Sequence, residues 1–370
     1  MKKLFMLALV VSTAALVNSV FAFAKYVDIT TTYTGGDVTD FPVLVKITTT
    51  TPTGFYSDVK NAGADLKFTD DSGNGDYPYE IDTWNASGDS YIWVKLPKLS
   101  AGMTFRMYYG DEEQTQPTNP ATAVWTGYDL VCHVNDASDS ATPTREGSVN
   151  PKSVARVDGK VGKAYGTSEA AQGAVFINTL YTDGTTGDLP DGQFSYSFWV
   201  RPVAEIPSNW SNLCGPKNGQ NADAWGVNTG AAGGTIIYPH TAKDKYVKTT
   251  VTGGFPVGTW RKIDVTMDGA FITAYVDGVQ LASTTLASVP RRCWVRSMGW
   301  GGSAGSGTFE GSSSIPVDVD ECRIFSTVAD ATRVAADYQT VANVATFLEF
   351  GDPQGGGPTV QVLPQGVIVK

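Results

Sequence analysis

The sequence predicts an all-β protein with two β-sandwich domains, and residues 258–283 carry the main evidence. Three runs of strand-forming residues follow one another there: Trp260–Met267, Ala270–Val276 and Val279–Ser283. Asp268-Gly269 and Asp277-Gly278 separate the runs, and Asp-Gly favours a two-residue turn because both positions accept a positive φ. The segment is therefore predicted to be a three-stranded antiparallel meander. Its single apolar face must pack on a second sheet, which indicates a sandwich.

Length and composition agree with this class. A chain of 370 residues suggests two domains, and 40 glycines beside only 27 lysines and arginines are typical of short strands joined by turns. The net charge of −10 argues against a nucleic-acid partner, because phosphate binding needs clustered basic residues.

The first 24 residues have the features of a secretory signal peptide. Lys2-Lys3 supply the positive charge, Leu4–Val11 begins an apolar stretch, and Ala22-Phe23-Ala24 fits the small-x-small cleavage rule. A membrane anchor is the alternative, but polar residues interrupt the apolar stretch. No later segment is apolar enough to predict a membrane span in the mature chain. We expect an exported protein, secreted, periplasmic or at the cell surface, that begins near Lys25.

Residues 25–118 are expected to form the first sandwich. Its expected strands are Val27–Tyr33, Phe41–Thr48, Asp65–Thr69, Tyr79–Trp84, Ser90–Leu96 and Thr104–Tyr109. Turn-forming clusters separate these strands, as in an all-β sandwich. Gln114–Pro120 is polar and carries two prolines, so it is a natural linker.

Residues 119–350 are expected to form the second sandwich. Beside the meander, its expected strands are Asp129–Val134, Ala174–Ile177, Phe194–Arg201, Ala224–Val227, Thr235–Tyr238 and Val317–Phe325. Asp330 is a candidate N-cap for a helix over Ala331–Val341. Residues 351–370 form a Gly- and Pro-rich tail, expected to be a flexible end or a linker to a docking strand.

Candidate catalytic groups are few. A retaining glycosidase needs two carboxylates about 5 Å apart, which a strand supplies from acids at positions i and i+2 on one face. Asp318 and Asp320 begin such a pattern, but residue 322 is Cys and Glu321 is expected on the opposite face. Asp320 and Glu321 are therefore expected to anchor neighbouring loops by accepting backbone hydrogen bonds. No nucleophile elbow occurs either, so we expect no catalytic residue and no enzyme activity.

Four cysteines are present: Cys132, Cys214, Cys293 and Cys322. Export would favour disulfides, and four cysteines allow three pairings. Zinc is disfavoured, because no Cys-x-x-Cys spacing occurs and His133 and His240 are the only histidines.

The first unit resembles a bacterial domain family without assigned function, domain of unknown function 2341. The matching segments are FPVLVKI (41–47), ADLKFTDDSG (64–73), YEIDTWN (79–85), YIWVKLP (91–97) and FRMYYGD (105–111). They cover nearly the whole unit in the same order. The family is typical of exported bacterial proteins with several domains, and it offers no catalytic residue to transfer.

The second unit resembles the laminin G-like domains of the concanavalin A-like lectin/glucanase class. The matching segments are FSYSFWVRP (194–202), GTWRKIDVTMDG (258–269), AYVDGVQLAS (274–283) and DVDECRIFS (318–326). The resemblance implies a jelly-roll sandwich that binds glycans or proteins, in some members with calcium. It also implies a structural role for His133, because relatives carry His there.

In this class the opening strand, 129–135, lies beside the closing strand, 319–325. Relatives carry Trp at the position of Cys132 and an aliphatic residue at that of Cys322, so two changes to cysteine on adjacent strands suggest one bridge. The resemblance therefore implies the disulfides Cys132–Cys322 and Cys214–Cys293. The first would close nearly the whole domain and contribute roughly 4 kcal/mol if unstrained.

A binding module needs aromatic and polar side chains on loops at one end of a rigid sandwich. Indole rings can stack on sugar rings, and amide groups can bind hydroxyls. The candidate ligand-binding residues are Trp210, Asn212, His240 and Trp300. Related domains sometimes place metal ligands after the opening strand, so a calcium site is a further candidate. Its expected ligands are Asp136, Asp139 and Asp320.

We therefore expect an exported, non-catalytic bacterial protein that binds a glycan or an extracellular protein through its laminin G-like domain. Two rival interpretations remain open. One is a structural cell-surface subunit whose C-terminal apolar strand docks on a neighbour's sheet edge. The other is a divergent glycoside hydrolase.

Overall fold

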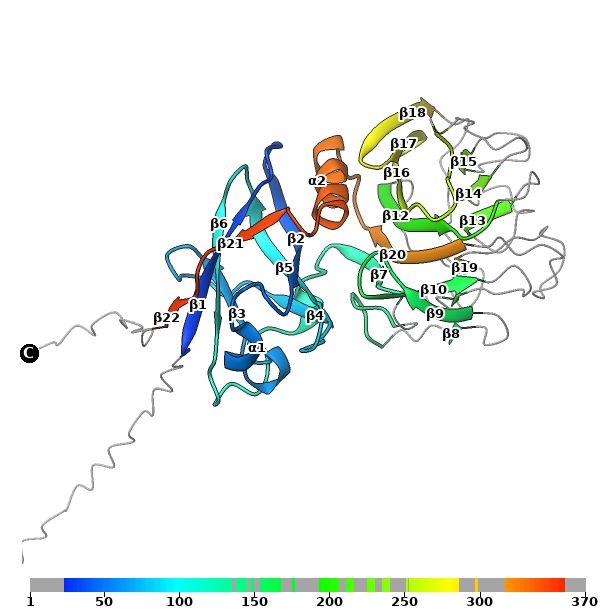
Figure 1. Cartoon of the computed structure of the whole chain (residues 1–370). Helices are drawn as coiled ribbons and strands as arrows, with labels where there is room; N and C mark the ends of the chain where they lie inside the picture. Colours follow the sequence, from blue (N-terminus) through cyan, green and yellow to red (C-terminus); the bar gives the residue numbers. More distant parts are fainter. Residues whose placement is uncertain are drawn as a thin grey trace, which may run out of the picture.

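The computed structural model describes residues 23–134, 138–144, 148–149, 154–167, 175–176, 193–205, 211–215, 225–229, 235–239, 251, 253–285, 297–298 and 317–356. Two β-sandwich domains lie side by side, with helix α2 (Ala331–Ala342) between them (Figure 1). Within the described residues, no helix is long and apolar enough to cross a membrane. The predicted signal peptide lies outside them, apart from Phe23 and Ala24.

The first domain consists of two small sheets packed face to face. One has the order β21-β1-β6-β3, with β22 also paired to β1, and the other has the order β2-β5-β4. The strands are β1 (Lys25–Thr31), β2 (Val38–Ile47), β3 (Lys67–Asp70), β4 (Tyr79–Thr83), β5 (Ser90–Leu99), β6 (Thr104–Tyr109), β21 (Leu348–Phe350) and β22 (Gln354–Gly355). Short helical turns connect them: α1 (Phe55–Asp58), η1 (Asn61–Gly63) and η2 (Ala121–Ala123). Alternate side chains of both sheets, such as Val27, Val43 and Phe105, fill the core between them.

The C-terminal segment returns to the first domain. β21 pairs antiparallel with β1, and β22 pairs with the start of β1. Phe347 and Leu348 are buried in the core of the first domain. The sequence pattern predicts a second domain up to residue 350 and a tail over 351–370, but this pairing assigns 348–355 to the first domain. The second domain is therefore an insertion, and both of its connections leave from one interface.

The second domain also consists of two sheets. We call the sheet β18-β17-β16-β12-β20-β10-β9, with β7 also paired to β20, the near sheet, and the sheet β15-β14-β13-β19-β11-β8 the far sheet. The near sheet contains β7 (Tyr128–Cys132), β9 (Val154–Asp158), β10 (Lys163–Thr167), β12 (Gln193–Pro202), β16 (Arg261–Asp268), β17 (Phe271–Val276), β18 (Val279–Thr285) and β20 (Val317–Phe325). The far sheet contains β8 (Ser148–Val149), β11 (Val175–Phe176), β13 (Ser211–Gly215), β14 (Trp225–Thr229), β15 (Thr235–Pro239) and β19 (Ser297–Met298). The near sheet turns its outer face to the first domain, and the far sheet lies on the remote side (Figure 1).

The predicted meander is confirmed as β16, β17 and β18. Its second turn is Asp277-Gly278, and both residues have positive φ, 52° and 76°, as a type I′ turn requires. The first turn was predicted one residue too early. Asp268 pairs with Phe271, so the turn residues are Gly269 and Ala270, and only Gly269 has a positive φ. A glycine at the first central position suits a type II′ turn.

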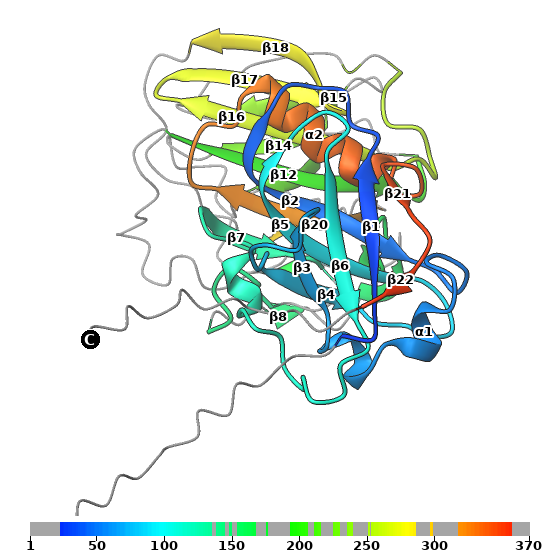
Figure 2. The same ribbon diagram turned by 90° about the vertical axis from the view of Figure 1, so that its left-hand side faces the viewer.

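Helix α2 begins where the sequence predicted. The Asp330 side chain accepts a hydrogen bond from the Arg333 N–H at 2.8 Å and so caps the first turn. The helix lies between β2 of the first domain and the near sheet (Figure 2). Tyr338 stacks on Trp199 of β12 at 5.6 Å, and Thr340 accepts a hydrogen bond from the Leu44 N–H of β2. The helix therefore packs on both domains at once.

The opening and closing strands of the second domain are neighbours, as expected. Cys132 of β7 and Cys322 of β20 are directly opposite each other and buried. No disulfide joins them in the structure. Cys214 lies in β13, and Cys293, its expected partner, lies outside the described residues. The strand adjacency is confirmed, and the two bridges remain predictions.

The type I′ turn can be tested by a matched pair of glycine substitutions. We expect Gly278→Ala to lower the free energy of unfolding by about 1–3 kcal/mol, because φ is positive and a Cβ would stand 3.0 Å from Tyr338 Cβ. Gly258→Ala is the control, since its φ is 78° but nothing lies within 4 Å. Urea unfolding of both variants separates backbone strain from the α2 contact. Equal losses of unfolding free energy in the two variants would show that the contact with Tyr338 has no effect on stability.

The Cys132–Cys322 bridge has a direct test. Opposite residues of antiparallel strands have Cα atoms about 4.5–5.5 Å apart, within the range of a disulfide. We expect peptide mapping of the non-reduced protein to join Cys132 to Cys322, and reduction to lower the free energy of unfolding by up to roughly 4 kcal/mol. A bond from either cysteine to Cys214 or Cys293 would refute the pairing.

Candidate functional site

A β-bulge in β20 decides which side chains face the first domain. Ser197 pairs with Arg323 and Trp199 with Asp320, so two residues of β20 oppose one residue of β12. Glu321 lies at the bulge and has a left-handed φ of 49°. Four residues of the strand point into the core of the second domain: Val317, Val319, Cys322 and Ile324. Asp320, Glu321 and Arg323 therefore share the outer face.

This arrangement corrects the expected alternation. Glu321 was expected on the face opposite Asp320, and residue 322 on the same face as Asp318. A prediction based on strict alternation of side chains does not include the extra residue of a bulge, which reverses the faces of the residues that follow it. The expected role of Asp320 as a loop anchor is confirmed, because its Oδ2 accepts the N–H groups of Lys160 at 2.7 Å and Val161 at 2.9 Å. Glu321 instead contacts other side chains.

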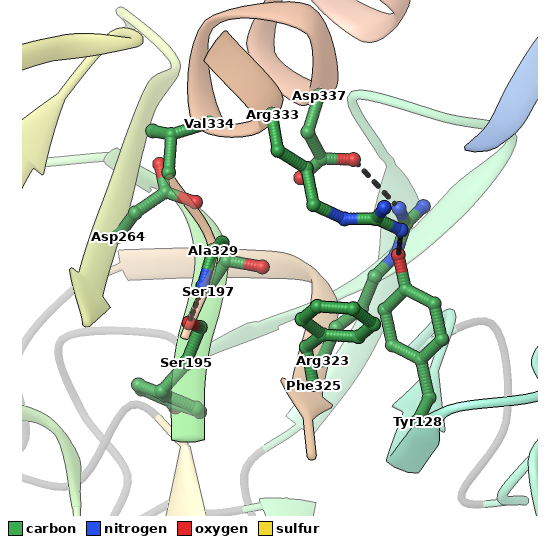
Figure 3. A pocket seen from close by; sticks show the side chains of 11 residues that line it. Tyr128, Ser195, Ser197, Asp264, Arg323, Phe325, Ala329, Arg333, Val334 and Asp337 are labelled. Atoms are coloured by element: carbon green, nitrogen blue, oxygen red, sulfur yellow. Dashed lines mark hydrogen bonds and ion pairs between the residues drawn. The ribbon is translucent and has the colours of Figure 1, made fainter. Parts of the chain in front are cut away.

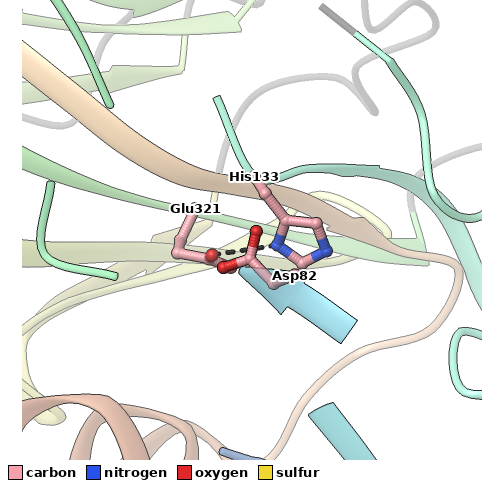
Figure 4. A group of neighbouring side chains, drawn as sticks. All are labelled: Asp82, His133 and Glu321. Carbon is pink, nitrogen blue, oxygen red and sulfur yellow. Dashed lines mark hydrogen bonds and ion pairs between the residues drawn. The ribbon is translucent and has the colours of Figure 1, made fainter. Parts of the chain in front are cut away.

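The outer face of β20 meets the first domain at a polar group that we call the interdomain cluster. It comprises Glu80, Asp82, His133, Glu321 and Arg323. His133 Nδ1 is 2.9 Å from Glu321 Oε1 (Figure 4), and His133 Nε2 is 3.3 Å from Glu80 Oε2. Glu80 belongs to β4 of the first domain, whereas His133 and Glu321 belong to the second. One imidazole therefore links carboxylates of both domains.

Aromatic rings enclose the interdomain cluster. The Arg323 guanidinium lies 4.1 Å from the ring centroid of Trp93 and 4.9 Å from that of Trp125. The His133 ring lies 6.1 Å from Trp93 and 5.4 Å from Trp125. The Trp125 indole N–H also donates a hydrogen bond to Glu80. These rings exclude water, so the charges they enclose depend on one another for stabilisation.

The electrostatics of the cluster favour a charged imidazole. Burial opposes the positive form of His133, but the carboxylates of Glu321 and Glu80 outweigh it and hold the His133 pKa well above its usual value. Burial likewise opposes ionised Glu321, yet His133 and Arg323 keep its pKa below its usual value. Burial and the charge of Glu321 raise the pKa of Asp320. The cluster is an imidazolium held between two carboxylates.

Asp82, His133 and Glu321 also place one ligand atom each within 4.8 Å of one another (Figure 4). Imidazole and carboxylate are ligands that zinc accepts. Both ring nitrogens of His133 already contact carboxylates, however, so a metal would have to replace a proton on the imidazole ring. The ion pairs account for the arrangement without one.

The residues expected to bind calcium have other contacts. Asp139 is fully buried, and its Oδ1 accepts the N–H groups of Val131 and Ala141, both at 3.0 Å. Asp320 accepts backbone N–H groups as described above. Asp136 lies outside the described residues. The described contacts of Asp139 and Asp320 are those of loop anchors.

The expected ligand-binding residues are connected to the far sheet. Asn212 lies in β13, Trp210 precedes β13 directly, His240 follows β15 directly, and Trp300 follows β19 by two residues. β15, β14, β13 and β19 are consecutive strands of that sheet. Trp210, His240 and Trp300 lie outside the described residues, as does the side chain of Asn212. The order of the paired strands therefore places all four positions in or next to strands of one sheet.

Sequence reasoning missed three members of the interdomain cluster: Glu80, Asp82 and Arg323. A signal for the first two was present, because Glu80 and Asp82 are two apart on a predicted strand and so share one face. Two acids on one face of a strand in a compact domain indicate a partner surface or solvent. Arg323 gave no such signal: its partner Glu321 is on the same strand, but the expected alternation gave no sign that Arg323 would be enclosed by Trp93 and Trp125 of other segments.

The link between the domains can be tested by removing the imidazole. We expect His133→Gln to lower the free energy of unfolding by about 3–5 kcal/mol near neutral pH, because Glu80 and Glu321 lose their shared cation. Lys163→Gln is the control, since it removes an ion pair with Asp158 in which both side chains are at least half exposed. Urea unfolding measures both. A loss no larger than that of the control would contradict the proposed role.

The same variant has an expected pH dependence. The His133 pKa is raised in the folded chain, so its contribution to stability is complete below about pH 6.5 and is lost as the pH rises through the folded value. The stability difference between the native protein and His133→Gln should therefore shrink at alkaline pH. A difference that grows with pH would contradict the assignment of the charge.

Family models match two parts of this sequence. Residues 62–145 match a family described as a domain of unknown function, DUF2341. Residues 178–335 match a laminin G model described as the concanavalin A-like lectin/glucanases superfamily. A search of curated proteins gave no match.

Several solved structures are similar. Domain 4 of AbnA, an extracellular GH43 arabinanase from Geobacillus stearothermophilus solved with arabinotriose, is 19% identical at a TM-score of 0.43, over 56% of this chain and 97% of that one. The binding domain of Paraclostridial Mosquitocidal Protein 1 is 14% identical at a TM-score of 0.45, and the match covers 59% of this chain and 53% of that one. Trypanosoma rangeli sialidase is 14% identical at a TM-score of 0.44, and the match covers 73% of this chain and 43% of that one. The similarity thus spans about half of each of the last two proteins.

The family matches and the fold agree with the order expected from the residues. The chain contains a DUF2341 domain followed by a laminin G-like domain of the concanavalin A-like superfamily, which is named for both lectins and glucanases.

Proposed function

We propose that this protein is exported and binds a carbohydrate or an extracellular protein through its concanavalin A-like domain, without catalysing a reaction. The observation that carries the proposal is the burial of the acidic face of the near sheet. Asp320 is 0% exposed and Glu321 is 2% exposed. The first domain and α2 cover this face, so its carboxylates serve the domain interface.

Hydrolysis of a glycoside would require these carboxylates to reach a sugar. Asp320 instead accepts backbone N–H groups, and Glu321 binds His133 and Arg323. A substrate could reach them only if the two domains separated, which would break the ion pairs and expose the Trp93 and Trp125 rings. The arrangement favours a binding protein over a glycosidase.

The far sheet is the better candidate for the ligand surface. It lies on the side remote from the first domain (Figure 1), and all four expected ligand-binding residues belong to or flank its strands. The indole rings of Trp210 and Trp300 would stack on the apolar face of a sugar, while Asn212 and His240 would bind hydroxyl groups. Export is supported by the predicted signal peptide.

A glycan array with the full mature chain would identify the ligand, and three variants would locate its site. We expect Trp210→Ala and Trp300→Ala each to weaken binding by about three- to tenfold, because one stacked ring is lost. Phe271→Ala is the matched control, since Phe271 is a 46% exposed aromatic of the near sheet. Equilibrium binding to the glycan found on the array measures all three.

Two outcomes would overturn parts of the proposal. Equal weakening by all three variants would reject the far sheet as the ligand surface. Release of sugars from mixed polysaccharides, abolished by Asp320→Asn or Glu321→Gln in a protein that remains folded, would establish a glycosidase.

A further inference from the structure

Helix α2 covers a small cavity on the outer face of the near sheet, lined by apolar and by charged side chains (Figure 3). Its volume is about 30 Å³. The lining includes Ser197, Asp264, Arg323, Arg333, Val334 and Asp337. The cavity is separate from the far sheet and from the predicted ligand-binding residues.

The cavity arises because a small residue lies between two charged ones. Ser197 of β12 is directly opposite Asp264 of β16 on one side and Arg323 of β20 on the other. Opposite side chains have Cβ atoms about 5 Å apart, so Asp264 and Arg323 start about 10 Å apart. Only the short serine side chain lies between them. Val334 and Asp337 of α2 close the space from above.

Two buried polar atoms beside this space have no protein partner: Asp264 Oδ2 and Arg323 Nε. Both residues are at most 4% exposed. Their other polar atoms are bonded, since Asp264 Oδ1 accepts a hydrogen bond from Lys262, and Arg323 donates to Asp337 at 3.0 Å and to Glu321 at 2.6 Å. Unpartnered buried polar atoms are strongly unfavourable, so a missing partner is indicated.

The chemistry of the lining identifies that partner. Lys262 contacts both Asp264 and Asp337, and Arg323 is paired with Glu321 and Asp337. These charges already have counter-charges, so the cavity favours a neutral molecule over an ion. The molecule must donate a hydrogen bond to Asp264 Oδ2 and accept one from Arg323 Nε, and water does both. One water needs roughly 10–15 Å³ of such volume, so the cavity can hold about two.

We propose that this cavity is a hydration site, in which one or two water molecules bridge Asp264 Oδ2 to Arg323 Nε above Ser197. The water adds a second link to a chain of ion pairs. Lys262 contacts both Asp264 and Asp337, and Asp337 accepts a hydrogen bond from Arg323 at 3.0 Å. Arg323 connects in turn through Glu321 and His133 to Glu80 of the first domain. The network thereby extends from the sheet beneath α2 to the first domain.

A crystal structure of the full chain, at a resolution that shows ordered waters, is the direct test. We expect density for one or two waters within hydrogen-bonding distance of Asp264 Oδ2 and Arg323 Nε. An empty cavity in a map that shows ordered waters elsewhere would overturn the proposal, as would density for a metal ion or an anion.

Two isosteric substitutions test the energetic role. Ser197→Thr and Ser197→Val fill the same volume, but only threonine retains a hydroxyl that can replace the displaced water. We expect the ratio of folded to unfolded protein to be about tenfold or more lower for Val than for Thr. Ser283→Thr and Ser283→Val at an exposed position of β18 control for intrinsic strand preference. Equal stability of the two Ser197 variants would show that the cavity needs no polar occupant.

Discussion

The arrangement of the two domains depends on one buried charge. His133 is 6% exposed and lies between Glu321 of its own domain and Glu80 of the other. A cation enclosed by indole rings is stable only if carboxylates accompany it, and a carboxylate so enclosed needs the cation equally. The first domain provides Glu80 but not its cation. Separation of the domains would therefore leave Glu80 without its imidazolium and would take one of the two carboxylates away from His133.

The chain topology reinforces this constraint. The second domain is inserted in the first, so two connections rather than one cross the interface. α2 packs against β2 and against the near sheet, and β21 then completes the sheet of the first domain. The outer face of the near sheet is consequently an internal surface of the protein. The far sheet lies on the side remote from the first domain.

The acidic motif of β20 illustrates why a sequence pattern can mislead about function. Read with a strict period of two, Asp318, Asp320 and Cys322 form an interrupted catalytic face. The bulge at Glu321 instead sends Cys322 into the core and brings Asp320 and Glu321 onto one face. Two carboxylates do lie together, yet they are committed to a loop and to a domain contact. The sequence identified Asp320 and Glu321 as acids, but it did not identify the groups that surround them.

Local features of the sequence determined much of the fold. Alternating residues marked fifteen segments that the structure forms as strands or parts of strands, the Asp330 cap marked the start of α2, and Asp277-Gly278 marked a type I′ turn. Each of these features is caused by residues close together in the chain, so the sequence pattern that predicts it contains the residues that produce it. The adjacency of Cys132 and Cys322 came from family resemblance, because pairing of distant strands leaves no local pattern.

Tertiary structure alone decided the register of the bulge, the return of β21 and β22 to the first domain, and the cluster around His133. Glu80, His133, Glu321 and Arg323 come from three separate segments, and their ionisation depends on the water that packing excludes. The cavity above Ser197 has the same origin, because it exists only where three strands and α2 meet. The sequence by itself determined the strands, most of their turns and the two domain types. Only packing between segments distant in the chain decided that the outer face of the near sheet is buried, because the groups that cover it come from α2 and the first domain.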